Sequence, residues 1–122
     1  MDKIAMQETK NSLLTQKYTK VLEEVNYDHN APHYFSVIRT EDNEELCNIR
    51  FQNGPIKEAG VNGVMDEDLI AMVIRRLEGF QGNKFACKEN EKALEKLQES
   101  LMWLRKRTMD REARNVEGTH IV

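Results

Sequence analysis

The sequence predicts an α+β fold: an N-terminal helix, a small antiparallel β-sheet, and then a long antiparallel helical hairpin that oligomerises. Apolar residues recur at spacings of three and four near both ends of the chain, which is typical of helices. Between them, two β-branched and aromatic runs alternate with period two, as strands do. Only 39% of the 122 residues are apolar and 32% are charged. A core this thin predicts that part of the apolar surface is buried between subunits.

The N-terminal helix is expected over residues 11–26. From Leu14 to Val25 the apolar residues are spaced mainly by three and four positions, which favours a helix. Residues 1–9 fit either a short turn or a strand. A loop should follow the helix, because the residue before Pro32 avoids helical backbone angles.

The sheet is expected to begin with a hairpin. Residues 34–39 and 46–51 are the two strand-like runs, and a polar turn-rich link joins them, so they should pair antiparallel. Asn53-Gly54-Pro55 ends the second strand with strong turn chemistry. A short third strand is expected over 56–58.

The helical hairpin occupies the second half of the chain. Asp66 resembles an N-cap, so the first helix should run from there to about Glu78 and end at Gly79 in a left-handed cap. A longer helix is expected over 88–114. Its apolar seam repeats at three and four positions: Leu94, Leu97, Leu101, Leu104 and Thr108. A short glycine-containing link should fold the two helices back on each other.

The length predicts one domain, residues 1–122, made of an N-terminal part (1–64) and the helical hairpin with its C-terminal turn (65–122). Trp103 is expected to pack against a neighbouring helix or subunit. The homo-oligomer is expected to be a dimer or a hexamer, and the sequence does not choose between them.

The sequence predicts a soluble protein of a reducing cytoplasm. No apolar run approaches 18 residues and no signal-peptide pattern opens the chain, so no membrane partner is expected. Cys47 and Cys87 have no metal or redox spacing, which fits a reducing compartment. Each is expected to be a small buried hydrophobe.

An arginine stripe marks the end of the long helix. Arg107, Arg111 and Arg114 follow at i, i+4 and i+7 and therefore share one helical face. Guanidinium groups bind phosphate and carboxylate through paired hydrogen bonds. The alternative is a solvated helix end whose cations offset the helix dipole. The net charge of −3 argues against a nucleic-acid partner.

Signatures of catalysis, metal binding and cofactor binding are missing from the pattern. No nucleophile elbow, P-loop or dinucleotide fingerprint occurs. His29 and His33 are separated by Pro32, so a helical metal pair is not expected and both should be loop histidines. The sequence thus predicts neither an enzyme nor a cofactor or metal site.

Three further residues could each have a ligand-binding role or a structural role. Phe80 flanks the glycine link, where it can stack on a base or plug the end of the hairpin. Asn90 can read a base edge or cap the long helix. His120 follows Gly118-Thr119 in the tail, where it can meet a ligand or belong to a frayed terminus.

Three segments carry a family resemblance: IRFQNGPIKEAGVNGV (49–64), LEGFQGNKFACKEN (77–90) and WLRKRTMDREARNVEGTH (103–120). They resemble the phage Thoeris anti-defence sponge family, which shares its helical hairpin with the phage anti-CBASS cyclic-oligonucleotide sponges. The resemblance covers about residues 30–120 and is most specific in the tail. Where the family commonly has glycine, this chain has Asn115, which also tolerates a left-handed turn.

The resemblance implies binding without catalysis in the host bacterial cytoplasm. Members sequester cyclic ADP-ribose isomers such as glycocyclic ADP-ribose, made by host TIR-domain proteins, and some also hold cyclic trinucleotides at a second site on a hexamer. The first site would use Phe80, Asn90, Arg107 and Arg111. The second would use Thr108, Arg114, Gly118, Thr119 and His120. The alternatives are an oligomeric helical regulator that binds nucleic acid and an enzyme that degrades the signal.

Overall fold

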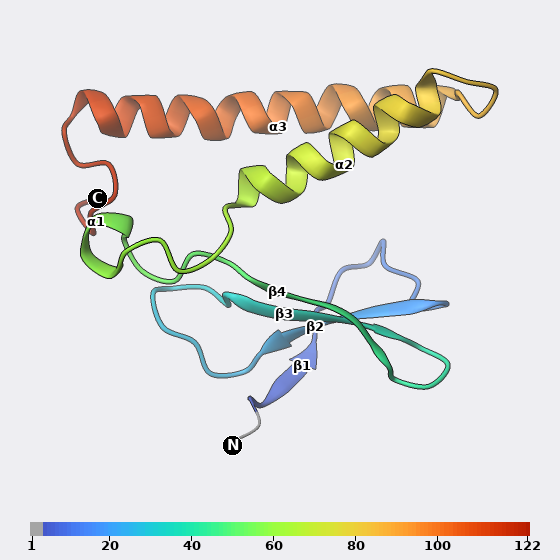
Figure 1. The fold of residues 1–122 in the computed structure, drawn as a ribbon, viewed down its shortest axis with the longest axis horizontal. Coiled ribbons are helices and arrows are strands. Elements are labelled where there is room, and N and C mark those ends of the chain that lie inside the picture. Colours follow the sequence, from blue (N-terminus) through green and yellow to red (C-terminus); the bar gives the residue numbers. More distant parts are fainter. Residues whose placement is uncertain (1–3) are drawn as a thin grey trace. The chain divides into compact units, whose positions relative to one another are not determined.

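The computed structural model describes residues 4–122, and the chain divides into two compact units at the Val64–Met65 boundary. The first unit is an antiparallel sheet with strand order β1-β2-β3-β4, followed by a short helix α1, and the second is the pair α2 and α3 (Figure 1). The bounds are β1 Met6–Glu8, β2 Thr19–Glu24, β3 Tyr34–Arg39, β4 Glu45–Arg50, α1 Ile56–Ala59, α2 Asp66–Gln81 and α3 Lys88–Ala113. The predicted α+β class is therefore confirmed.

The expected N-terminal helix over 11–26 is wrong, because this stretch contains a loop and β2. Val21 is paired with Val37 of β3, and five of the six β2 residues lie half-buried. A short strand with both faces partly covered can have the same spacing of apolar residues as a helix. Hydrogen bonding to β3 then outweighs the local preference of the sequence for a helix. The strand alternative for residues 1–9 is confirmed at β1, and residues 1–3 lie outside the described part.

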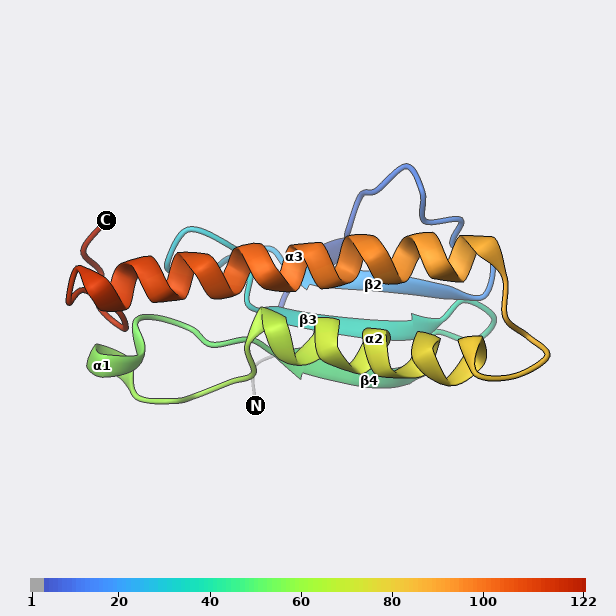
Figure 2. The same cartoon turned by 90° about the horizontal axis from the view of Figure 1, so that it is seen from above.

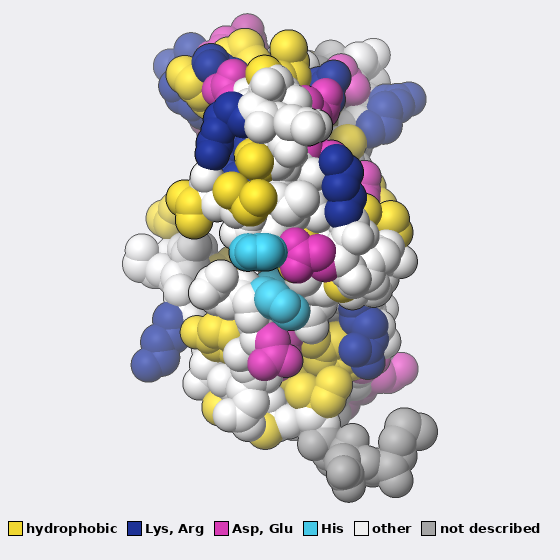
Figure 3. All heavy atoms as spheres, turned by 90° about the vertical axis from the view of Figure 1, so that its left-hand side faces the viewer, with side chains coloured by type: hydrophobic (Ala, Val, Ile, Leu, Met, Phe, Trp, Pro, Cys, Tyr) yellow, Lys and Arg dark blue, Asp and Glu magenta, His cyan; other side chains and the backbone are white. Residues whose placement is uncertain are grey.

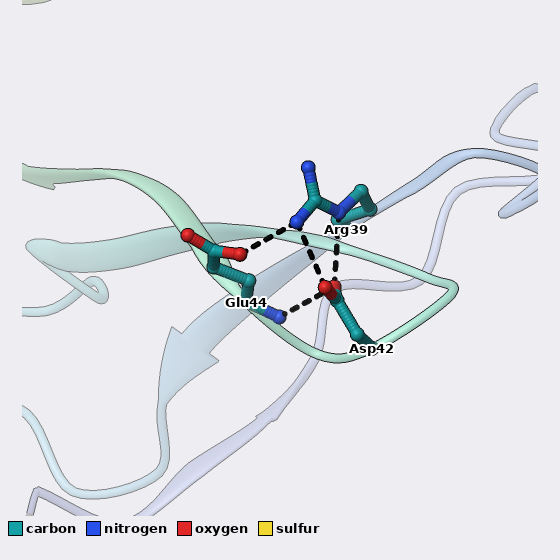
Figure 4. A network of polar contacts seen from close by, with 3 residues as sticks. All are labelled: Arg39, Asp42 and Glu44. Atoms are coloured by element: carbon teal, nitrogen blue, oxygen red, sulfur yellow. Dashed lines mark hydrogen bonds and ion pairs between the residues drawn. The ribbon is translucent and has the colours of Figure 1, made fainter.

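The predicted hairpin of β3 and β4 is confirmed, and an ion-paired turn closes it (Figure 4). Arg39 donates from Nε and Nη2 to the two carboxylate oxygens of Asp42, at 3.0 and 2.8 Å, and from Nη2 also to Glu44. The Asp42 carboxylate accepts the Glu44 backbone N–H as well. The nearby Arg39 guanidinium lowers the pKa of Asp42. The turn is thus fixed by a fork-shaped arginine contact.

The expected third strand over 56–58 is wrong, because α1 occupies this position. Pro55 has a backbone φ of −63°, and its carbonyl accepts the N–H of Ala59 at 2.7 Å. Proline favours the start of such a turn because its φ is already fixed near the helical value.

A close backbone approach joins the two ends of the loop that contains α1. Phe51 and Val64 form a parallel bridge, and a Cβ on Gly63 would lie 2.5 Å from the Phe51 carbonyl oxygen. The side chains of Gln52 and Asn62 donate to and accept from backbone groups across the same loop. Only glycine fits at position 63, which accounts for this glycine in the resembling segment.

Helices α2 and α3 lie side by side as the predicted antiparallel hairpin (Figures 1 and 2). Its details differ from expectation at both ends of α2. Met65, and not Asp66, is the N-cap, and its N–H donates to the Asp68 carboxylate at 2.9 Å. Gly79 lies within the helix, which continues to Gln81 and ends at Gly82 with φ −85°, so no left-handed cap is used.

The half-buried residues of α3 form a heptad row that includes the predicted seam. They are Asn90, Leu94, Leu97, Leu101, Leu104, Thr108 and Arg111. Alternating steps of four and three keep a row on one side of a helix. The predicted seam is therefore confirmed, and it has one polar residue beyond each end.

No apolar side chain is fully buried within residues 4–122. In the helical unit, large apolar side chains are exposed on the helices at Met72, Met102, Trp103 and Met109, and in the link between the helices at Phe85. Cys47 and Cys87 are also exposed, so their expected burial is wrong. Within the described chain, no helix has the length and apolar content to span a membrane. These exposed apolar side chains are available for burial between subunits, and the predicted oligomer stays a prediction.

Candidate functional site at the two ends of the helical hairpin

Phe80 and Asn90 lie at the same end of the helical hairpin. Phe80 is in the last turn of α2 and Asn90 is in the first turn of α3. The side chain of Gln81 joins the two helices, because its amide donates to the Cys87 carbonyl at 3.0 Å and accepts the Cys87 N–H at 2.9 Å. The six-residue connection is thus closed by one side chain, which sets the spacing of the ring and the amide.

Asn90 is not the cap of α3. Cys87 is the N-cap, and its Sγ accepts the backbone N–H of Asn90 at 3.4 Å. No hydrogen bond within residues 4–122 involves the Asn90 side-chain amide. Of the two readings offered by the sequence, the capping one is therefore wrong, and the amide has donors and an acceptor for a ligand.

Arg107 lies toward the opposite end of α3, and its side chain is exposed. Seventeen residues separate it from Asn90, which is about 25 Å along a helix. Its neighbours are paired, since Lys106 contacts Asp110 at 2.9 Å and Arg105 contacts Glu112 at 3.9 Å. Arg107 has no ion pair or hydrogen bond to its side chain within the described residues. An exposed guanidinium without an ion pair can bind an anion such as a phosphate group.

Arg111 organises the C-terminal turn. Its Nη2 donates to three backbone carbonyls, those of Val116 and Thr119 at 3.1 Å each and that of Ile121 at 2.8 Å. Its own carbonyl accepts the Val116 N–H at 3.0 Å. The sequence pattern did not predict this role of Arg111. The signal for it is Asn115, which tolerates a left-handed turn and follows Arg111 by four residues.

The residues of the expected second site lie around the same turn. Asn115 has a φ of +60° and Gly118 one of +74°, so the predicted left-handed turn at Asn115 is confirmed. Arg114 donates to the Val122 carbonyl, and Thr119 Oγ1 donates to the Val116 carbonyl. The tail is a hydrogen-bonded turn and not a frayed end. His120 is exposed, and Thr108 lies on α3, where its hydroxyl donates to the Leu104 carbonyl at 3.2 Å.

The remaining histidines belong to the sheet unit and have structural partners. His29 Nδ1 lies 2.8 Å from Asn53 Oδ1, and His33 Nε2 lies 2.7 Å from the Asp28 carbonyl oxygen. Both are loop residues, as the sequence predicted. Residues 4–122 contain no cluster of histidine, cysteine and acidic side chains suited to a metal ion.

Charges of both signs are interspersed over the face shown in Figure 3, without a continuous basic patch. A protein that binds nucleic acid through its phosphates would need a basic stripe.

The helical unit has the architecture of a hairpin-domain protein. A phenylalanine and an asparagine lie at the tip of its antiparallel hairpin, and arginines lie at the far end. Residues 43–109 match the Acb2/Tad1 hairpin domain, and the chain belongs to this family. It is 44% identical over 140 residues to Thoeris anti-defense 1 of Bacillus phage SBSphiJ7, an alignment that covers 94% of this chain and 99% of that relative. The resemblance found in the sequence is thus confirmed.

Proposed function

We propose that this protein is a phage sponge that binds and sequesters cyclic ADP-ribose isomers, glycocyclic ADP-ribose among them. These are the signals of TIR-based Thoeris immunity in the host bacterial cytoplasm. The observation that carries the proposal is 44% identity, across 94% of the chain, to a relative named Thoeris anti-defense 1. The protein would act by keeping the signal bound and away from the immune effector, so it would not need to cleave the signal.

The side chains at the two ends of the hairpin suit the two parts of this ligand. Phe80 offers a ring on which the adenine stacks, and the Asn90 amide can meet the edge of the base. The doubly charged pyrophosphate suits Arg107 and Arg111, whose guanidinium groups donate charge-assisted hydrogen bonds. Ring, amide and arginines all lie in the helical unit that begins at Met65.

The proposed site is shared between two protomers. Within one chain, about 25 Å of α3 separates Asn90 from Arg107, too far for one small ligand. An antiparallel pairing of two hairpins brings the tip of one to the arginine end of the other and forms two equivalent pockets. The exposed apolar side chains Met102, Trp103 and Met109 supply apolar surface for such pairing.

A second kind of site is proposed at the C-terminal turn for the cyclic trinucleotides of CBASS. Its residues are Thr108, Arg114, Gly118, Thr119 and His120. The support is a guanidinium and two hydroxyls near a turn with left-handed residues at Asn115 and Gly118, because guanidinium and hydroxyl groups can donate hydrogen bonds to phosphate oxygens. A higher assembly, such as a hexamer, would present this turn several times.

Recovery of the ligand tests the main proposal. The protein is incubated with glycocyclic ADP-ribose, freed of unbound ligand, heated, and the supernatant is analysed by mass spectrometry. A sponge returns the signal at unchanged mass, whereas an enzyme returns a product of different mass. Failure to retain the signal, together with salt-dependent binding to DNA duplexes, would instead support a nucleic-acid regulator.

A further inference from the structure

Two adjacent arginines on α2 have different neighbours. The guanidinium carbon of Arg76 lies 5.1 Å from the centroid of the Phe80 ring, one helical turn further on. Arg75 instead lies beside Gly79, with its Nη1 3.8 Å from the position that a Cβ there would take. Both arginines line a shallow open hollow on α2 together with Ala71, Met72 and Gly79. Only one of the pair therefore contacts the ring.

A cation over one face of an aromatic ring is attracted by the ring quadrupole, and a planar guanidinium can also stack. Arg76 forms no ion pair within residues 4–122, and its guanidinium lies over the Phe80 ring. The contact restricts the rotation of the Phe80 side chain. With one face held by Arg76, base stacking is directed to the opposite face of the ring.

We propose that Arg76 is a positioning residue that holds the Phe80 ring in the orientation that stacks on the ligand base. This inference rests on the proposed function, in which Phe80 receives the adenine of a cyclic ADP-ribose isomer. Arg76 acts through Phe80, and it is distinct from Arg107 and Arg111, which are proposed to hold the pyrophosphate. Lysine at position 76 would keep the charge but would lose the planar surface.

A double-mutant cycle on the full-length protein tests this assignment. Calorimetry with glycocyclic ADP-ribose is run on the unmodified protein and on Arg76→Ala, Arg75→Ala, Phe80→Ala and Arg76→Ala/Phe80→Ala. Arg75→Ala is the matched control, because it removes the same charge from the same hollow without touching the ring. Thermal unfolding of each variant checks that the fold is retained.

Arg76→Ala should weaken binding roughly two- to fivefold, the size of an exposed cation–π contact, while Arg75→Ala changes it by less. In the Phe80→Ala background, removal of Arg76 should have no further effect, because the two residues act as one unit. An equal loss in both backgrounds would overturn the inference and show that Arg76 contacts the ligand directly. Equal effects of the two arginine changes would overturn it as well. No binding by the unmodified protein would overturn the proposed function itself, and this inference with it.

Discussion

The guanidinium of Arg111 donates a hydrogen bond to the Thr119 carbonyl oxygen, 3.1 Å away across the C-terminal turn. The same Nη2 also serves the carbonyls of Val116 and Ile121. The residue expected to hold a pyrophosphate thus also holds the tail that carries the expected second site. Its Nε and Nη1 are not used in these contacts and can donate to a phosphate oxygen.

Replacement of Arg111 by alanine should weaken both the turn and ligand binding. Three carbonyls lose a charged donor, and we expect the free energy of unfolding to fall by about 1–3 kcal/mol. Amide hydrogen exchange at residues 116–121 should become faster. Urea denaturation and exchange mass spectrometry measure the two effects, with Arg105→Ala as control. An unchanged exchange rate in the tail would contradict the organising role of Arg111.

Replacement of Arg107 should separate binding from stability. Its side chain forms no hydrogen bond or ion pair within the described residues, so Arg107→Ala should leave the unfolding midpoint unchanged. Loss of one charge-assisted hydrogen bond to a pyrophosphate costs about 1.5–3 kcal/mol, so binding should weaken roughly ten- to a hundredfold. Calorimetry with glycocyclic ADP-ribose gives the affinity. Unaltered affinity would remove Arg107 from the proposed site.

Mixing two weakly binding variants tests whether each pocket is shared. Phe80→Ala protomers contribute intact arginines and Arg107→Ala protomers contribute an intact ring, so a mixed dimer regains one complete pocket. Light scattering must first show a mass that is a multiple of the 14.2 kDa protomer. Calorimetry of the mixture should then show a class of tighter sites, with the affinity of the unmodified protein, that neither variant has alone. No recovery after proven subunit exchange would rule out the shared pocket.

Two glycines should respond oppositely to alanine. Gly79 lies inside α2, and an added Cβ would meet only Arg75 Nη1 at 3.8 Å. Gly79→Ala should therefore stabilise the protein by about 0.5–1 kcal/mol through better helix propensity. At Gly63 the Cβ would lie 2.5 Å from the Phe51 backbone, so alanine should destabilise by about 1–3 kcal/mol. Thermal denaturation of the pair provides the comparison, and the same sign for both would contradict this account.

The turn between β3 and β4 should lose its ion pair in acid. Arg39 lowers the pKa of Asp42 below its ordinary value of 3.8, so the pair contributes stability above this pH and loses it as the pH falls through the lowered pKa. Asp42→Asn should be less stable than the unmodified protein at neutral pH. The difference should shrink below about pH 4. Denaturation at several pH values measures it, with Glu41→Gln as control, and a pH-independent difference would be a contrary result.

The helical hairpin was predictable from sequence because its apolar rows are long and regular. The N-terminal stretch was not, since the spacing around Val21 fits a helix as well as a short strand, and only the pairing with β3 decides between them. For the candidate site, residue types and family resemblance predict Phe80 and Arg107, and these assignments stay predictions. The contact of Arg111 with the tail depends on the backbone path after α3, which no spacing within the helix specifies.

The heptad row of α3 begins at Asn90 and ends at Arg111, 21 positions apart, which is three whole heptads and about 31 Å. In the proposed antiparallel pair, this length would set the separation of the two sites and place the asparagine of one protomer opposite the arginine of the other. Inserting seven residues near the middle of α3 would increase the distance between Asn90 and Arg111 and keep both residues on the same side of the helix. Inserting two would turn one end away by about 200°. If the proposed pairing holds, the number of heptads in α3 matters to the two pockets as much as the residues proposed to touch the ligand.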